Sequence, residues 1–114
     1  MNLTILKVSD ILSDITIDKN SIIKIIENNK VELLGQFTND NNKIDPNKIS
    51  HSISNLRYNN VLNSLDCKIT PLDTAYGKQL SLFFDKEIKL RWYPIFVNND
   101  NKIKLVTINV SKND

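Results

Sequence analysis

The stretch ISHSISNLRYNNVLNSLDCKIT, residues 49–70, decides the fold. Two runs with strand composition, 49–58 and 61–70, are separated only by Asn59 and Asn60. Asparagine tolerates the positive φ angles that a two-residue hairpin loop requires, so this stretch predicts an antiparallel hairpin. Side-chain alternation in the second strand predicts one apolar face, which contains Val61, Leu65, Cys67 and Ile69.

The residues before the hairpin predict two strands and a short helix. A strand is expected at 2–8, followed by a linker that contains Asp10 and Asp14. The polar residues 18–21 offer N-cap oxygens for a helix at about 20–28, and Asn28-Asn29 can end it, because asparagine tolerates the left-handed conformation. The apolar run 31–37 predicts a buried strand, and the polar segment 38–48 predicts a loop that is the most mobile part of the chain.

The residues after the hairpin predict a second helix and two further strands. Asp73 or Thr74 is a suitable N-cap, and Gly77 inside the helix indicates close packing against another backbone. The run 88–97 has strand composition, but Pro94 lacks an N–H group and requires an edge position or a bulge. After a turn at 98–101, the last strand is expected to place Val106, Ile108 and Val110 on one face. The apolar face expected for the helix consists of Tyr76, Leu80, Phe83 and Phe84.

These elements predict an α+β fold in a single domain, residues 1–114. The expected architecture is a mostly antiparallel, barrel-like sheet of about six strands with two helices.

Composition narrows the function classes. The net charge is only +2, with lysines scattered among acids, so the chain lacks the basic patch that is typical of nucleic-acid binding. Cys67 is the only cysteine, which excludes an internal disulfide, and it is interpreted as a small buried hydrophobe. No spacing of ligand residues indicates a metal site, and no cofactor is expected. No long apolar segment or signal peptide is recognisable, so a cytosolic, non-secreted protein is expected.

His51 is the only histidine, and its role is the main question that the sequence raises. It shares a strand face with Ile49 and Ile53, which is more typical of a structural residue than of a catalyst. Ser50, Ser52 and Ser54 alternate with it and are expected to point away, as a solvated face.

A second group of candidate residues lies in the strand at 88–97. Arg91, Trp92, Tyr93 and Phe96 are of the types that dominate protein interfaces, and aromatic rings can also stack on nucleic-acid bases. The alternative is that they form an ordinary core-and-edge strand.

The order of the elements resembles the prohead maturation protease family of tailed phages, whose barrel is similar to that of the herpesvirus assemblins. The residues 49–51 match the Val-Ser-His element of that family, and 69–78, ITPLDTAYGK, match its segment at a helix start. The resemblance covers about 31–97 and implies that His51 corresponds to the catalytic histidine.

The sequence departs from this family at the strand that carries the serine nucleophile. Tyr93 and Pro94 stand where the two forms of the family have serine, and Ile95 replaces the arginine that follows. A phenol with a pKa near ~10 on a rigid ring is a poor substitute for the serine hydroxyl. The resemblance therefore implies a protease-like fold in which His51 is a vestige.

Three functions remain open at this point. The first is a non-catalytic phage protein, acting as a virion or assembly component or as a protein-interaction module with Arg91, Trp92, Tyr93 and Phe96 as binding residues. Its partner would be a capsid or other phage assembly protein, in the host cytoplasm or the virion. The second is an active serine protease that uses another serine, such as Ser50 or Ser81. The third is a single-stranded nucleic-acid-binding protein, which the near-neutral charge does not favour.

Overall fold

The computed structural model describes residues 1–12, 15–38, 45–100 and 102–112. It confirms an α+β fold with antiparallel sheets and two α-helices. The described residues form eight strands rather than about six. All six expected strands are present, and two further short strands pair as a small hairpin near the N-terminus that the sequence did not predict. The elements are β1 (Asn2–Lys7), β2 (Ile11–Leu12), β3 (Ile15–Thr16), α1 (Lys19–Asn28), β4 (Leu33–Gln36), the 3₁₀ turn η1 (Pro46–Lys48), β5 (Ile49–Asn59), β6 (Ser64–Pro71), α2 (Ala75–Asp85), β7 (Leu90–Asn99) and β8 (Lys102–Lys112).

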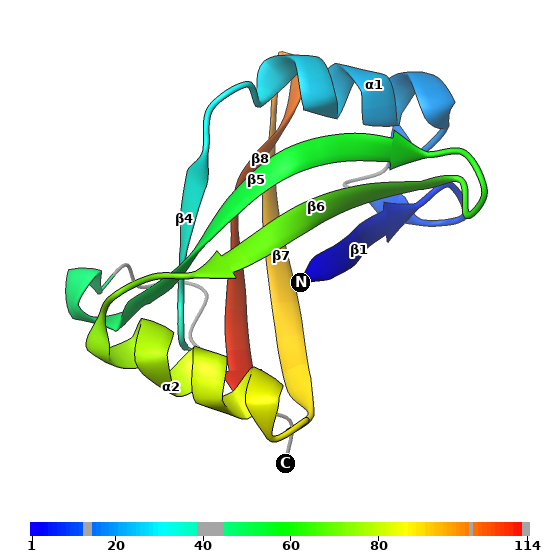
Figure 1. Ribbon diagram of the computed structural model, residues 1–114. Helices are drawn as coiled ribbons and strands as arrows, with labels where there is room; N and C mark the ends of the chain where they lie inside the picture. The colour runs from blue at the N-terminus through cyan, green and yellow to red at the C-terminus, as the bar shows by residue number, and fades with distance from the viewer. Residues whose placement is uncertain (13–14, 39–44, 101, 113–114) are drawn as a thin grey trace.

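The strands form a four-stranded sheet in the order β1-β6-β5-β4, the small β2-β3 pair and a long β7-β8 ribbon. The four-stranded sheet lies in front of the ribbon in Figure 1, with α1 across one end of the molecule and α2 across the other. Helix α1 packs on β8 and β5, whereas α2 packs on β5 and β6. The segment that follows β4 reaches β8, where the Thr38 N–H donates to the Val110 carbonyl at 2.8 Å. The two sheets thereby enclose one core.

Both helices begin where the sequence predicted. The Asp18 carboxylate caps α1 by accepting from the Ser21 N–H at 2.8 Å, and these bonds keep the pKa of Asp18 below its ordinary value. The Thr74 hydroxyl caps α2 by accepting from the Gly77 N–H at 2.9 Å. The end of α1 differs from the expectation, because its C-cap Asn29 has φ −125° rather than a left-handed conformation.

Gly77 confirms the expected close packing. A Cβ built on it would lie 2.0 Å from the Leu72 carbonyl oxygen and 2.9 Å from that of Ser50. No larger residue fits between α2 and these two backbones.

The structure confirms the β5-β6 hairpin, but the prediction of a two-residue turn is wrong. The turn spans four residues, 60–63, and Asn59 belongs to β5, where its side-chain oxygen accepts from the N–H groups of Val61 and Leu62. Val61 is therefore 87% exposed instead of buried, and Leu62 is 54% exposed. The rest of the predicted face, Leu65, Cys67 and Ile69, is buried.

A β-bulge changes the expected pattern of the last strand. Ile95 lies opposite Thr107 and Phe96 lies opposite Leu105, so Val106 has no partner in the ladder. This extra residue shifts the alternation, and Val106 is exposed while Ile108 and Val110 are buried. The prediction that these three residues share a face is therefore wrong.

Pro94 is confirmed at an edge, because β7 pairs only with β8 among the described strands. The loop expected at 38–48 ends in η1, capped by Asp45, and residues 39–44 lie outside the described residues, as does Asp14.

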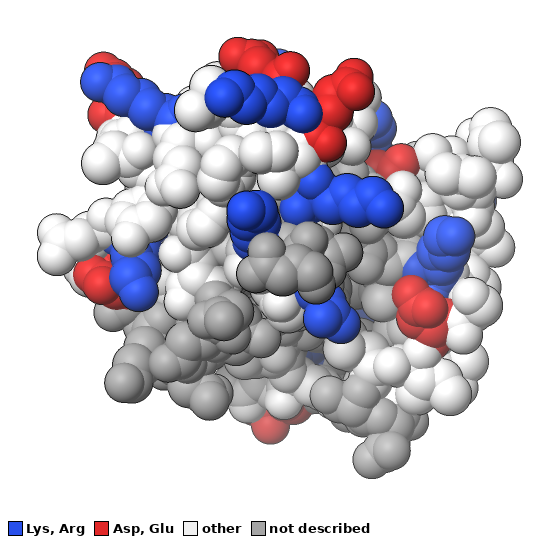
Figure 2. Space-filling view, turned by 90° about the horizontal axis from the view of Figure 1, so that it is seen from below, with Lys and Arg blue, Asp and Glu red and all other residues white. Residues whose placement is uncertain are grey.

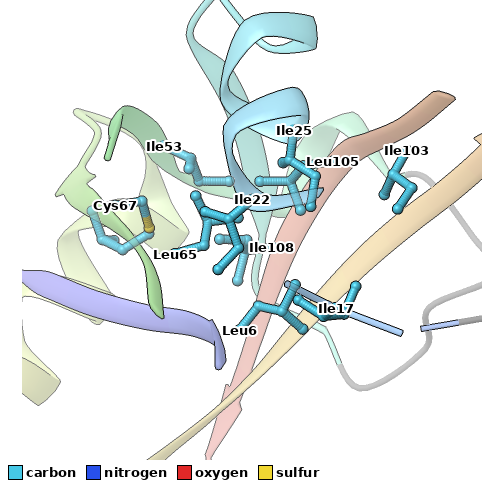
Figure 3. Close-up of a cluster of buried hydrophobic side chains, with 11 residues drawn as sticks. Leu6, Ile17, Ile22, Ile25, Ile53, Leu65, Cys67, Ile103, Leu105 and Ile108 are labelled. Carbon is cyan, nitrogen blue, oxygen red and sulfur yellow. The ribbon is translucent and has the colours of Figure 1, made fainter. Parts of the chain in front are cut away.

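The main core lies between the two sheets and under α1. Figure 3 shows aliphatic side chains from α1, β5, β6 and β8 converging on one cluster. Cys67 belongs to this cluster, as predicted, and burial raises the pKa of its thiol to about 12. The buried residues of the cluster are Leu6, Ile17, Ile22, Ile25, Ile53, Leu65, Cys67, Ile69, Ile103, Leu105 and Ile108.

Candidate functional site

His51 lies in β5 and is completely buried between the two sheets. Its Nε2 atom lies 2.6 Å from the Ile108 carbonyl oxygen in β8, and its Nδ1 atom lies 2.7 Å from the Ser50 hydroxyl oxygen. A carbonyl oxygen only accepts, so Nε2 carries the proton and Nδ1 accepts from the Ser50 hydroxyl. Both ring nitrogens of the neutral imidazole are thus satisfied inside the protein.

The ring is also fixed by its apolar neighbours. Trp92 in β7 meets it edge-on, with ring centroids 5.5 Å apart and an interplanar angle of 86°. On the other side, a Cβ built on Gly35 would lie 2.1 Å from Nε2. Gly35 in β4 is therefore a glycine because the imidazole occupies the space that a side chain would need.

The surroundings favour the neutral form of the imidazole. Burial lowers the pKa of His51, and the hydrogen bond to Ile108 opposes this shift only in part. A neutral imidazole that accepts from a serine hydroxyl is the resting arrangement of a serine hydrolase. Here, however, both Ser50 and His51 have no exposed surface, so a substrate in solution cannot reach the pair.

The serines of β5 do not form a solvated face, and this prediction is wrong. Ser50 and Ser52 are buried and Ser54 is half-buried, and both helices, α1 and α2, pack against β5. Ser50 was expected to point away from His51, but its hydroxyl turns back along the strand to the ring. Ser81 lies exposed on α2 and is not a partner of either ring nitrogen.

The four candidate binding residues of β7 do not form one surface. Trp92 and Phe96 pack against the core, and Trp92 stacks on Phe84 at 6.3 Å. Arg91 and Tyr93 share the outer face, with the guanidinium carbon 5.8 Å from the centre of the Tyr93 ring. The hydroxyl of Tyr93 accepts from Ser111 at 3.2 Å and so lies away from His51.

His51 is one of several residues that hydrogen-bond to the second edge of β8. Strand β8 has a continuous ladder with β7 along one edge only. Its other edge meets mostly side chains, with a single isolated backbone bridge between Phe37 and Val110. Asn29 donates to the Leu105 carbonyl at 2.7 Å and accepts from the Leu105 N–H at 2.9 Å. The same edge receives the following further bonds: Asn28 to the Ile103 carbonyl, His51 to the Ile108 carbonyl and the Gln36 N–H to the Asn109 side chain.

The face seen in Figure 2 shows no single-sign patch, since Lys and Arg side chains are interspersed with Asp and Glu there. Within the described residues, no group of three or more His, Cys, Asp or Glu side chains is placed to hold a metal ion. None of the helices in this part of the chain is both long and apolar enough to cross a membrane.

Comparison of the chain with protein-family models, with curated proteins and with solved structures found no match. The resemblance to the prohead proteases therefore stays a prediction that rests on the short motifs at 49–51 and 69–78.

Proposed function

We propose that this chain is a non-catalytic protein with a degenerate prohead-protease-like fold, which acts as a phage virion or assembly component or as a protein-interaction module. Its partner is a capsid or other phage assembly protein, and it works in the host cytoplasm or the virion. The proposal that the protein is non-catalytic rests on the burial of the His51 imidazole. His51 has no exposed surface, and both of its nitrogens are occupied within the protein.

The outer face of β7 supports the binding part of the proposal. Arg91 and Tyr93 lie side by side there, and arginine and tyrosine are enriched among the residues that dominate protein interfaces. Trp92 and Phe96 are half-buried on the inner face, so they act by holding the strand in place. Of the four binding residues predicted from the sequence, only Arg91 and Tyr93 are therefore available to a partner on this face.

The test is affinity capture from the native source with wild type and with the double variant Arg91→Glu/Tyr93→Ala. A partner that depends on this face is lost in the double variant. Lys104→Glu, a charge reversal at an exposed position further along β8, is the matched control and keeps the partner. Retention of every copurifying protein by the double variant refutes the β7 face as the binding surface.

A second candidate function is a serine protease with Ser50 as nucleophile, which the 2.7 Å separation of the Ser50 hydroxyl and His51 Nδ1 favours. It requires an opening of the structure that exposes the pair. Incubation with a fluorophosphonate probe separates the two functions. Labelling that disappears in Ser50→Ala and in His51→Ala supports the protease, and absence of labelling supports the non-catalytic protein.

A further inference from the structure

We propose that the groove between the C-terminal end of α1 and the bulged part of β5 binds an extended peptide segment that carries a basic side chain. This inference rests on the proposed interaction function and names a surface and a class of partner for it. It concerns a part of the molecule that neither His51 nor the β7 face includes.

The first observation is an unpaired strand edge. Strand β4 pairs with β5 only as far as Leu33, which lies opposite Ile53. Strand β5 continues to Asn59, so its edge beyond Ile53 has no strand partner within the described residues. A free edge offers N–H and C=O groups to an added strand.

The second observation is a bulge at the same place. Ser54 lies opposite Lys68 and Arg57 opposite Asp66, so Asn55 and Leu56 together face one residue of β6. Asn55 has φ 56°, and its side chain has no partner among the described residues. A space lined by residues of both elements lies between this bulge and the C-terminal end of α1.

This space is a groove of about 410 Å³, within the range of roughly 300–1,000 Å³ that binding clefts occupy. Ile26, Leu56 and the exposed Val31 supply apolar surface for alternate side chains of a peptide. The complete lining consists of Ile26, Glu27, Asn29, Lys30, Val31, Glu32, Ser54, Asn55 and Leu56.

The charge of the groove selects the partner. Glu27 and Glu32 are exposed in the lining, and neither forms an ion pair within the described part of the chain. Lys30 is the single cation of the lining, so the carboxylates exceed it by one. The C-terminal end of α1 adds partial negative charge at the same place. A lysine or arginine side chain of a peptide complements this arrangement.

The test is selection of a displayed library of random heptapeptides against the folded wild-type chain. We expect enrichment of sequences in which Lys or Arg is flanked by aliphatic residues. A synthetic copy of the enriched peptide is then titrated by calorimetry. Its affinity falls at least tenfold in Glu27→Lys/Glu32→Lys, and a copy with Glu in place of the basic residue does not bind. Asp85→Lys at the exposed end of α2 is the matched charge control and keeps the affinity.

The variants are first compared with wild type by circular dichroism, and only variants that keep the wild-type spectrum are scored. The inference is overturned if no basic peptide is enriched, or if the enriched peptide binds Glu27→Lys/Glu32→Lys as tightly as wild type. If the enriched peptide is instead lost in Arg91→Glu/Tyr93→Ala, the groove fails while the interaction function stands. If neither the library nor the native source yields a partner, both fail.

Discussion

The two edges of β8 are held by different chemistry. Along one edge, a backbone ladder runs the whole length of β7, from Leu90 opposite Lys112 to Asn99 opposite Lys102. Along the other edge, α1, β4 and β5 contribute mostly side chains, above all Asn29 and His51. A ladder tolerates changes of side chain because its bonds are made by the backbone, whereas the second edge depends on the identity of a few buried residues. The substitutions below test this difference.

Gly35→Ala is expected to have the largest effect. The new Cβ would lie 2.1 Å from His51 Nε2 and 2.3 Å from the Ile108 carbonyl oxygen, so the bond that joins β5 to β8 cannot form as it does in wild type. We expect a loss of about 3 kcal/mol in the free energy of unfolding, at the upper end for overpacking. Urea denaturation measures it, and a loss below about 0.5 kcal/mol would show that the second edge adapts easily.

Asn29→Ala is expected to follow. Asn29 makes two bonds to the Leu105 backbone and is buried, so its removal leaves a buried N–H and a buried carbonyl unsatisfied. The expected loss is about 2 kcal/mol, at the lower end of the roughly 1–3 kcal/mol that each of the two orphaned groups costs. Asn28→Ala, which removes one bond at an exposed neighbour, is the control and should cost about 1 kcal/mol or less. Equal losses for the two variants would contradict the importance of burial at this edge.

The pH dependence of stability tests His51 itself. Burial places the folded-state pKa of His51 below its ordinary value of 6.5, so between these two values the unfolded chain binds more protons. The contribution of His51 is fully present above about pH 6.5 and is lost as the pH falls below it, by at most about 1.4 kcal/mol per pH unit. Urea denaturation at pH 7.5, 6.5 and 5.5 should show this slope.

His51→Gln provides the control, because the chain has no other histidine. This variant should have a lower but flat stability between pH 5.5 and 7.5. If it does not fold, NMR titration of the wild-type ring serves instead. A ring that titrates at pH 6.5 or above would contradict the buried, neutral imidazole.

Pro94→Val is expected to have the smallest effect on stability. Pro94 lies on β7, whose outer edge is free among the described strands, and its ring removes an N–H group from that strand. The free energy of unfolding should change by less than about 0.5 kcal/mol, while the restored N–H makes the edge more prone to pair with a second molecule. Sedimentation velocity should therefore show more self-association than in wild type. Unchanged monomer content would show that Pro94 does not protect this edge.

The sequence predicted the helices and the long strands because their signals are local. Asp18 and Thr74 cap helices within three residues of the groups they bind, and strand alternation is visible over five or six residues. The turn was misplaced because Asn59 and Asn60 have turn composition, while the Asn59 side chain in fact caps a longer turn. The bulge at Val106 leaves no local signal, so the phase change in β8 was missed.

The second edge of β8 could not be predicted for a different reason. His51 bonds to a residue 57 positions away, and Asn29 to one 76 positions away. Neither pairing has a spacing rule, because it depends on how two sheets and a helix come together. The position of Ser50 was wrong because regular alternation places neighbouring side chains on opposite faces, whereas its short side chain reaches back to the His51 ring. The sequence therefore identified His51 as the candidate residue, but it did not predict the groups that His51 contacts.

Because Cys67 is buried and is the only cysteine, its reaction with an alkylating reagent can report local opening of the native structure. With a pKa of about 12 and no exposed surface, the thiol is almost entirely protonated and inaccessible in the native state. Alkylation by iodoacetamide at pH 8 can then proceed only through molecules in which β6 has come away from its neighbours. The labelling rate therefore measures how often this opening occurs, without a dye or an engineered residue. Prompt labelling of the native chain would contradict the burial of Cys67.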